Sequence, residues 1–552
     1  QMQFADSLID ISDKEQVEQV IEKIRHKLEN PEEAPDDGGS EEGPGDEKKL
    51  PTVQLVVDID LNDEDASFAL KQSISDVSYE GSIDFSVYKF KPYSYQEAGI
   101  RWILGLAQKT LGINEEDVGK HGALLADDMG LGKTFMSLVA VKEYQALAKA
   151  KGETERPVLM VGPLSLLENW RDEVKAVYGD NESPFDSIVT LQADADLRKY
   201  RTGKGVETRQ PDADDESAIR YSLKVGGGTD RLDMPRRLVL TTYETLRDYQ
   251  FSLSLIDWSF VIFDEAQRIK NPNALWTRAA KALKARFKLL ATGTPVENHL
   301  GDFWCLMDTA RPGELGAYQQ FRASYIKPIT AANDEEKSKI RVKLGRELRM
   351  SVGSSMLRRV KEDQLEGLPT KTIYAGEKES SNGTEYLEVL ACEMPTTQRK
   401  RYDTVIGIVQ EEQESGESGN SVLAGLHRLQ DVSLHPQLLD GGLLPMPSNE
   451  KEARQTVAES GKLQQTFALL DEIKSKKEKV IIFAINKRLQ SFLKVACERV
   501  YGIKVSIING DTKAVAKKAN THTRKSLITA FEIVEGFGVI VMSPVAAGMG
   551  LT

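Results

Sequence analysis

The sequence predicts an α/β protein with a doubly wound parallel sheet in its first large domain and a second α/β unit after a helical region. Short apolar strands alternate with helical segments, as parallel sheets require. A glycine-rich loop ending in Gly132-Lys133-Thr134 follows one of these strands. Polar residues follow several others, and this is the edge at which open α/β sheets bind ligands.

Composition bounds the class of protein. The chain has 552 residues, 40% of them hydrophobic and 28% charged, which suits a soluble globular protein of about three or four domains. No run of 18 apolar residues exists, so no membrane span is expected. Because the chain begins with Gln1 and shows no signal peptide, we expect a fragment or a processed form. Three widely spaced cysteines indicate a reducing, cytoplasmic setting without disulfides.

Charge is unevenly placed along the chain. Residues 1–50 contain 15 acidic and six basic side chains, a net charge of −9 out of −13 for the whole protein. The remainder is close to neutral and can still carry a basic groove. Residues 12–30 are predicted as an amphipathic helix, and residues 32–47 as an acidic, disordered linker. Residues 51–85 form an accessory segment to which we assign no function.

Residues 124–134 (LLADDMGLGKT) form the centre of a predicted nucleotide site. Gly130 and Gly132 allow the backbone to turn tightly and aim its N–H groups at phosphate oxygens. Lys133 can reach the β- and γ-phosphates, and the Thr134 hydroxyl can bind Mg²⁺. The next residues favour a helix, whose N-terminus adds the positive end of its dipole.

One position departs from the usual phosphate-loop spacing, because Asp127 stands where a glycine is expected. The loop alone could therefore be an ordinary turn. Upstream, Gln96 could read an adenine edge, since a carboxamide donates and accepts hydrogen bonds together. The predicted nucleotide contacts are Gln96, Asp128, Met129, Gly130, Leu131, Gly132, Lys133 and Thr134.

A second group of candidate catalytic residues follows a predicted strand at residues 260–263. This strand ends in Asp264-Glu265-Ala266-Gln267. A carboxylate at a strand tip beside a phosphate loop can hold Mg²⁺, and its neighbour can accept a proton from attacking water. Thr134 and Asp264 are the predicted metal ligands. A further strand at residues 289–293 leads into a Thr-Gly-Thr-Pro turn at the same kind of edge.

Other segments complete the predicted organisation. Strands at residues 158–161 and 238–240 flank a polar stretch, 178–237, which we expect to be a surface insertion rather than core. Thr241 and Thr242 end the second of these strands, where their hydroxyls either contact a phosphate backbone or cap the next helix. The first domain is predicted over residues 86–330.

Residues 331–458 are mostly helical in pattern, and residues 459–552 form the second α/β unit. That unit has a predicted helix at 461–470 and strands at 480–484, 505–508 and 537–542. With about 95 residues, we expect it to lack at least one closing element.

These blocks, in this order, resemble the Swi/Snf family (Snf-two ATPases) of helicase superfamily two from about residue 91 to residue 552. The family commonly has Asp at the Asp127 position, which accounts for the missing glycine. The shared motifs are SYQEAG, ADDMGLGKT, PLSLLENW, DEAQRIKN and ATGTPVEN, then RPGELGAYQQF, MLRRVKED and LHPQLL, and finally SGKLQQTFALL, VIIFAIN, IINGDT and SPVAAGMGLT.

The resemblance implies two RecA-like lobes with a helical insertion between them, the second lobe incomplete, and ATP with Mg²⁺ at the strand tips of the first. Lys133 would cradle phosphates, Asp264 would hold Mg²⁺ and Glu265 would polarise water. Gln267 would couple the γ-phosphate to the DNA-facing motifs. An arginine-bearing sixth motif is expected beyond Thr552. The implied DNA contacts are Ser165, Thr241, Thr242, Asn271, Ser543 and Gly548.

The leading hypothesis is an ATP-driven motor that moves on double-stranded DNA without separating its strands, or displaces bound protein. Its setting could be a multi-component system of bacterial phage defence. A strand-separating DNA or RNA helicase and a nucleotide-gated DNA clamp or scaffold are the alternatives. Arg358 and Arg359 could brace the lobes, contact DNA or form solvated ion pairs. Trp102, Trp170 and Trp304 are predicted as core anchors.

Overall fold

The computed structural model describes residues 77–179, 182–192, 196–202, 221–228, 230–296, 300–331, 351–365, 392–414, 420–512 and 523–547. It also describes short segments at residues 2–4, 7–9, 53–54, 206–207, 209–210, 340, 343–345, 347–349, 372–374 and 385–387. The chain divides into two compact units, residues 1–366 and 367–552. The helix predicted at 12–30 and the linker at 32–47 lie outside the described residues.

The first unit is built on a seven-stranded parallel sheet with the order β11-β4-β10-β9-β5-β8-β6. Five central strands are buried along their whole length, because helices cover both faces of the sheet. The strands are β4 (Gly122–Leu125), β5 (Val158–Gly162), β6 (Ser187–Leu191), β8 (Arg237–Thr242), β9 (Trp258–Asp264), β10 (Ala285–Ala291) and β11 (Met356–Leu357).

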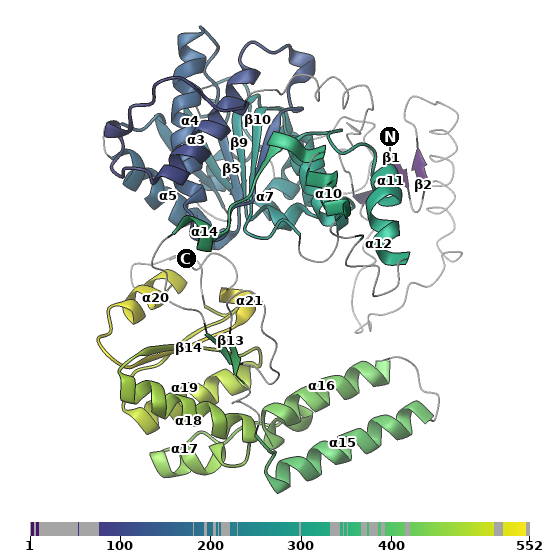
Figure 1. Ribbon diagram of the computed structural model, residues 1–552, viewed down its shortest axis with the longest axis vertical. Helices are drawn as coiled ribbons and strands as arrows, with labels where there is room; N and C mark the ends of the chain where they lie inside the picture. The colour runs from purple at the N-terminus through teal and green to yellow at the C-terminus, as the bar shows by residue number, and fades with distance from the viewer. Residues whose placement is uncertain are drawn as a thin grey trace. The chain divides into compact units, whose positions relative to one another are not determined.

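Two layers of helices enclose this sheet (Figure 1). One face is covered by α3 (Ser94–Ala107), α4 (Lys133–Ala150) and α5 (Leu164–Tyr178). The other is covered by α7 (Tyr243–Asp248), α8 (Gln250–Ser254), α9 (Leu275–Ala282) and α10 (Leu300–Ala310). The shorter helices are α6 (Asp196–Tyr200), α11 (Tyr318–Phe321), α12 (Lys327–Ala331) and α14 (Lys361–Gln364).

Two small antiparallel pairs accompany the main sheet. β1 (Met2–Phe4) pairs with β2 (Ser7–Ile9), and β3 (Val53–Gln54) pairs with β7 (Arg209–Gln210). Of the accessory segment at residues 51–85, the structure describes only β3 and residues 77–85.

The prediction that residues 178–237 lie outside the core is wrong in part. β6 is an edge strand of the main sheet and pairs with β8 in parallel. Apolar side chains scattered through this polar stretch are buried in the same hydrophobic cluster as the central strands: Leu191, Leu197, Tyr200, Leu223 and Leu232. Burial of these isolated apolar residues stabilises a segment whose average composition is polar.

The first unit also extends beyond the predicted limits of 86 and 330. Val77, Tyr79 and Ile83 pack on the core upstream, and β11 adds a seventh strand downstream. The division between the units falls after residue 366. Of the predicted tryptophan anchors, Trp170 and Trp304 are buried, and Trp102 is half-buried.

The second unit has a three-stranded parallel sheet in the order β14-β16-β15 (Figure 1). Its strands are β14 (Lys479–Phe483), β15 (Ser506–Ile508) and β16 (Gly538–Met542). α17 (Glu450–Val457), α18 (Gly461–Lys476) and α19 (Lys487–Tyr501) pack on one face, and α20 (Arg524–Glu532) on the other; α21 (Pro544–Ala547) follows β16. The predicted α/β fold class is confirmed in both units.

A helical hairpin, α15 (Thr396–Glu414) and α16 (Asn420–Leu434), precedes this sheet, as predicted for the helical region. The buried amide of Gln398 donates to the Val432 carbonyl at 2.8 Å and accepts from Gly461 N at 3.0 Å. This amide ties the hairpin to the start of α18. A parallel pair, β12 (Thr372–Tyr374) and β13 (Glu385–Leu387), lies near the start of the second unit in sequence. No helix among the described residues is long and apolar enough to span a membrane.

Candidate nucleotide site

The carboxyl ends of three neighbouring strands bring the predicted nucleotide-site residues together. β10 lies between β4 and β9 and runs parallel to both. Ala291, the last residue of β10, pairs with Leu125 on one side and Asp264 on the other. The loop after β4, the acidic turn after β9 and the Thr-Gly-Thr turn after β10 therefore leave the sheet at one edge.

Left-handed glycines shape the loop after β4. Gly130 has φ = 87° and Gly132 has φ = 82°, which a side chain would strain. A Cβ atom added to Gly132 would also lie 2.4 Å from Nε2 of Gln96, so the close approach of Gln96 requires glycine. Gln96 Nε2 donates to the Leu131 carbonyl at 3.3 Å. The predicted adenine-reading residue thus lies against the loop.

Lys133 begins α4, so the free N–H groups of the first helical turn open at the loop. Its amino group donates to the backbone carbonyls of Asp127 at 2.7 Å and Asp128 at 3.1 Å. Burial lowers the pKa of this amino group. Four nearby carboxylates oppose that decrease: in order, Asp264, Glu265, Asp127 and Asp128. The acids of both predicted motifs therefore favour the charged form of Lys133.

The remaining predicted loop residues occupy different environments. Leu131 is buried, whereas Met129 is 51% exposed. A Cβ atom added to Gly293 would lie 2.8 Å from Cγ of Met129, so the Thr-Gly-Thr turn packs against the loop. Thr134 is half-buried in the first turn of α4, and its hydroxyl has no hydrogen-bond partner among the described residues. That hydroxyl is therefore available to a metal ion.

Asp264 is held at the tip of β9 by three donors. Trp170 Nε1 donates to its Oδ2 at 2.7 Å, and Glu265 N donates to its Oδ1 at 3.0 Å. The Tyr243 hydroxyl donates to its backbone carbonyl at 2.8 Å. Burial raises the pKa of the Asp264 carboxyl to about 6, while the Trp170 hydrogen bond opposes the rise. The position of Asp264 is thus fixed before any metal binds.

The role of Trp170 was missed by the sequence reasoning, which assigned it only to the core. The signal was its place on the helix after β5, the strand beside β9. An indole donor on such a helix can reach a polar strand tip, because tryptophan is an apolar body with one polar N–H.

A chain of side-chain hydrogen bonds joins the acidic turn to the turn after β10. Gln267 Nε2 donates to Glu265 Oε2 at 2.8 Å, and the Thr292 hydroxyl donates to Gln267 Oε1 at 2.7 Å. Thr294 N donates to the Thr292 hydroxyl at 3.1 Å. Glu265 itself has φ = 51°, a strained conformation for a residue with a side chain. Strain of this kind at a strand tip is typical of functional sites.

Arg359 holds the start of the phosphate loop from 232 residues downstream. Its Nε donates to both carboxylate oxygens of Asp127 at 3.1 Å, and its backbone N–H donates to Oδ1 at 3.0 Å. Asp127 is fully buried, and the Arg359 side chain is 12% exposed. The pair is therefore a buried ion pair, not the solvated one left open by the sequence. Arg358 is farther from its acid, with Nη2 3.8 Å from Asp128 Oδ1.

The predicted DNA-contact residues fall into two groups. Thr241 is fully buried and its hydroxyl donates to the Leu191 carbonyl at 3.2 Å. Thr242 is 5% exposed and caps α7, accepting from Thr245 N at 3.1 Å. Of the two roles predicted for these threonines, Thr242 therefore has the helix-capping one. Because both hydroxyls are buried, neither is available to a phosphate backbone in this conformation.

The other predicted DNA contacts are more accessible. Asn271 is exposed after the acidic turn, and its Oδ1 accepts from Asn273 N at 2.9 Å. Ser165 is half-buried in the first turn of α5, at the carboxyl end of β5. Ser543, in the second unit, is half-buried after β16, and Gly548 lies outside the described residues.

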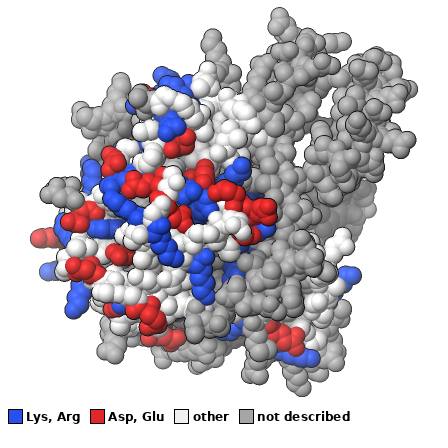
Figure 2. Space-filling view, turned by 90° about the horizontal axis from the view of Figure 1, so that it is seen from above, with Lys and Arg blue, Asp and Glu red and all other residues white. Residues whose placement is uncertain are grey.

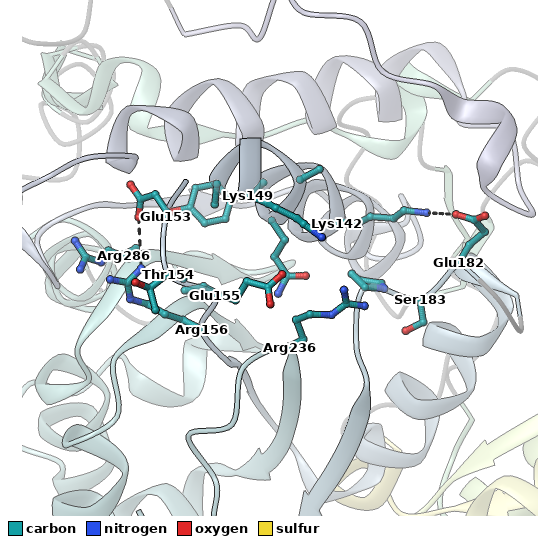
Figure 3. Close-up of a pocket in the computed structure, with 16 residues that line it drawn as sticks. Lys142, Lys149, Glu153, Thr154, Glu155, Arg156, Glu182, Ser183, Arg236 and Arg286 are labelled. Atoms are coloured by element: carbon teal, nitrogen blue, oxygen red, sulfur yellow. Dashed lines mark hydrogen bonds and ion pairs between the residues drawn. The ribbon is translucent and has the colours of Figure 1, made fainter. Parts of the chain in front are cut away.

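A pocket of about 250 Å³ lies at the opposite edge of the sheet, where the strands begin (Figure 3). Arg236 precedes β8 there, and Arg156 precedes β5. Two lining cations are paired within the pocket: Lys142 with Glu182 at 3.0 Å, and Arg156 with Glu153 at 3.4 Å. None of the predicted nucleotide-site residues lines it.

Basic and acidic side chains alternate on the face shown in Figure 2. A surface that binds duplex DNA is expected to concentrate Lys and Arg, because it must neutralise a row of phosphates. The described residues on this face do not show that concentration (Figure 2).

The strand order, with a phosphate loop and an acidic pair at its carboxyl edge, defines the class of phosphate-loop α/β proteins. Comparison with known families narrows this class. The model of the SNF2-related domain matches residues 95–438, and the chain belongs to this family.

Several curated proteins are similar to this chain. The Zorya protein ZorD of Escherichia coli O139:H28 is 34% identical over 512 residues, covering 91% of this chain and 42% of ZorD. The DNA excision repair protein CSB of Oryza sativa is 26% identical, covering 90% and 39%. The putative ATP-dependent helicase/translocase YwqA of Bacillus subtilis is 26% identical, covering 83% and 41%. The chain therefore spans less than half the length of these relatives.

A solved structure, the Sulfolobus solfataricus SWI2/SNF2 ATPase core in complex with dsDNA, is also similar. It is 24% identical, with 84% of this chain and 80% of that chain covered and a TM-score of 0.38.

Proposed function

We propose that the chain is the ATPase core of a motor that couples ATP hydrolysis to movement along double-stranded DNA or to displacement of bound protein. One observation carries the proposal. Lys133, at the end of the phosphate loop that follows β4, and the pair Asp264-Glu265, at the tip of β9, stand at the same carboxyl edge of the sheet, on either side of β10. A lysine for phosphates beside an acid pair for metal and water is the minimal set for phosphoryl transfer to water.

Each residue has a proposed role. Lys133 and the N–H groups at the start of α4 bind the β- and γ-phosphates. Thr134 and Asp264 would hold Mg²⁺, which when bound neutralises phosphate charge. Glu265 accepts the proton of the attacking water. Gln96 orients the adenine, and the remaining proposed nucleotide contacts are the backbone and side chains of residues 128–132.

Coupling to DNA is proposed to run through Gln267. Its amide touches both Glu265 and Thr292, so a shift of the acidic turn would move the turn after β10. Ser165, Asn271, Ser543 and Gly548 would contact the DNA backbone, where hydroxyl, amide and N–H donors approach phosphates without reading sequence. Thr241 and Thr242 would join them only after a rearrangement that exposes them.

Two alternatives remain distinct from a duplex motor. A strand-separating DNA or RNA helicase would use the same nucleotide site. A nucleotide-gated clamp or scaffold would not need a general base, yet Glu265 is present and linked by Gln267 to the neighbouring turn. That link favours an enzyme.

The proposed setting is the bacterial cytoplasm, in a multi-component system of phage defence. The 34% identity to the Zorya protein ZorD of Escherichia coli supports a bacterial setting. Protein partners from such a system, and no membrane, are the expected surroundings.

The proposal is tested by ATP turnover of the full-length protein with duplex DNA, single-stranded DNA and RNA, beside a strand-displacement assay. Duplex DNA should stimulate turnover without separation of its strands, and Lys133→Ala should weaken ATP binding itself. Stimulation by RNA alone, or robust strand separation, would favour the helicase alternative. DNA binding that needs ATP but is accompanied by no turnover would favour the clamp.

A further inference from the structure

The segment after β11 runs along the phosphate loop and is bonded to it by backbone atoms. Ala126 N donates to the Leu357 carbonyl at 2.7 Å, and Asp128 N donates to the Arg359 carbonyl at 3.1 Å. Lys361 N in turn donates to Asp128 Oδ2 at 3.1 Å. These hydrogen bonds continue the β4–β11 ladder, and we call the paired segment, residues 357–361, the strip. The strip holds the backbone of residue 361 beside the phosphate loop.

Among the described residues, four basic side chains lie at this strip, and three of them have a carbonyl or carboxylate partner. Lys133 donates to carbonyls of its own loop. Arg359 is bonded to the buried Asp127 carboxylate, and Arg358 lies 3.8 Å from an oxygen of Asp128. Four acidic side chains act on the charge of Lys133: the two aspartates of the loop and the acidic pair at the tip of β9. The number of acids thus equals the number of basic side chains. The local charge is therefore balanced before any polyanion binds.

The Lys361 amino group is the uncommitted cation. It has no hydrogen bond and no carboxylate within 4.0 Å among the described residues. The side chain crosses the α-carbon of Gly130, since a Cβ atom added there would lie 3.4 Å from Nζ and 3.9 Å from Cε. Gly130 is also the glycine whose left-handed backbone turns the loop. An ammonium at this position lies beside the N–H groups proposed to bind phosphates.

We propose that Lys361 is a second lysine of the nucleotide site and binds the phosphate chain of a nucleoside triphosphate. This inference deepens the proposed function and rests on it. Lys133 approaches the phosphates from the end of the loop, and Lys361 approaches from the Gly130 side. A flexible ammonium acts as a point charge toward phosphate, and its hydrogen bond to an anionic oxygen is among the stronger ones.

Arg359 and Asp127 act on this lysine as positioning residues. Their ion pair holds the strip in register with the loop, and Lys361 follows Arg359 by two residues. Val360, between them, has an extended backbone, and Lys361 then begins α14, so the register of the strip sets where Lys361 starts. The shared motif MLRRVKED thus provides Arg359, which supports the phosphate loop, and Lys361, which binds the nucleotide phosphates in this proposal.

The test measures displacement of a fluorescent ATP analogue from the full-length protein by ATP and by adenosine, with Mg²⁺ present. Lys361→Gln should weaken ATP binding about 10-fold, as loss of one charge-assisted contact does, and leave adenosine binding unchanged. Lys361→Arg should stay within about threefold of the wild type, since the charge remains. Lys109→Gln is the matched control, because Lys109 is exposed beyond the far end of α3, about 20 Å from Gln96.

Each result decides the proposal. Wild-type protein that binds ATP, with Lys361→Gln equal to it, overturns the role of Lys361 and leaves the proposed function standing. Equal weakening of ATP and adenosine, or a lower unfolding midpoint in Lys361→Gln, would assign the lysine a structural role instead. Wild-type protein that binds no ATP would overturn the proposed function, and this inference with it.

Discussion

The carboxylate of Asp264 is buried, and burial of a charged group destabilises the folded state. It is 8% exposed, and burial raises its pKa from 3.8 to about 6. The folded state therefore binds a proton more tightly than the unfolded state does. Stability linked to this group is fully present below pH 4 and is lost as the pH rises toward 6. The proposed metal site thus gives up some stability at neutral pH in order to offer an ionised oxygen.

Asp264→Asn should therefore stabilise the protein above pH 6 while abolishing activity. Relative to wild type, the free energy of unfolding of the variant should rise by about 2 kcal/mol between pH 4 and pH 7, because the amide does not titrate. Urea unfolding without nucleotide or Mg²⁺ measures the difference. A variant whose stability relative to wild type stays constant across this range would show that Asp264 is not perturbed.

The ion pair of Arg359 with Asp127 is the second feature at this scale. Its acid is fully buried, and its base is 12% exposed, so removal of one partner leaves an unpaired buried charge. Such a charge destabilises far more than loss of an exposed pair.

Arg359→Met should lower the free energy of unfolding of the first unit by about 3–5 kcal/mol, and adding Asp127→Asn should restore part of it. Tryptophan fluorescence reports this unit, because all five tryptophans lie between residues 102 and 304. Lys199→Met, which removes an exposed pair with Asp230, should cost less than about 1 kcal/mol. A similar small loss in Arg359→Met would show that the loop is held by its backbone bonds alone.

At the scale of elements, the turns after β9 and β10 are joined by the Gln267 amide. Thr292 is fully buried, and its hydroxyl is both donor to Gln267 and acceptor from Thr294 N. One hydroxyl therefore holds together two turns that belong to different strands. Valine has nearly the same shape but lacks both hydrogen bonds.

Thr292→Val should keep ATP binding within a few-fold of wild type and reduce DNA stimulation of turnover by about 10-fold, as loss of a buried hydrogen bond of about 1.4 kcal/mol would. Thr309→Val is the control, since its buried hydroxyl donates to the Cys305 carbonyl within α10 and joins no two turns. If both variants lose stimulation equally, the effect is one of packing and the coupling role of Gln267 is lost.

The elements that the sequence predicted are those with local signals. Apolar runs marked the central strands, and glycines marked the loop between β4 and α4, so the carboxyl edge followed from parallel topology. β11 has only two residues, and its partner lies more than 200 residues away, so no local pattern could reveal it. β6 was missed for a different reason, because its SIVTL run sits in a stretch whose composition is polar.

The same distinction holds for the site. Lys133, Asp264, Glu265 and Gln267 were predicted from motifs, and the structure brings them to one edge. The bonds from Trp170 to Asp264 and from Arg359 to Asp127 span 94 and 232 residues. Hydrogen bonds between residues so far apart in the sequence form only when the fold packs them together. No local sequence pattern predicts that packing. The burial of the Thr241 hydroxyl could not be predicted from the sequence either, because it depends on the packing of β8 in the sheet.

At the scale of the whole molecule, the two units each carry a parallel α/β sheet, and the family match runs from residue 95 to residue 438 across their boundary. The nucleotide residues described above belong to the first unit. In the proposed mechanism its strand-tip acids perform hydrolysis, with Glu265 as the base. Everything proposed about DNA movement depends on that chemistry.

The most direct test is the rate of ATP hydrolysis by full-length Glu265→Gln protein with duplex DNA, measured beside its affinity for ATP. ATP binding should persist, because Lys133 and the loop are intact, and DNA-stimulated turnover should fall by about 10²- to 10⁴-fold, as loss of a general base causes. Glu116→Gln, an exposed acid away from this edge, should behave as wild type. Normal turnover in Glu265→Gln would contradict the account.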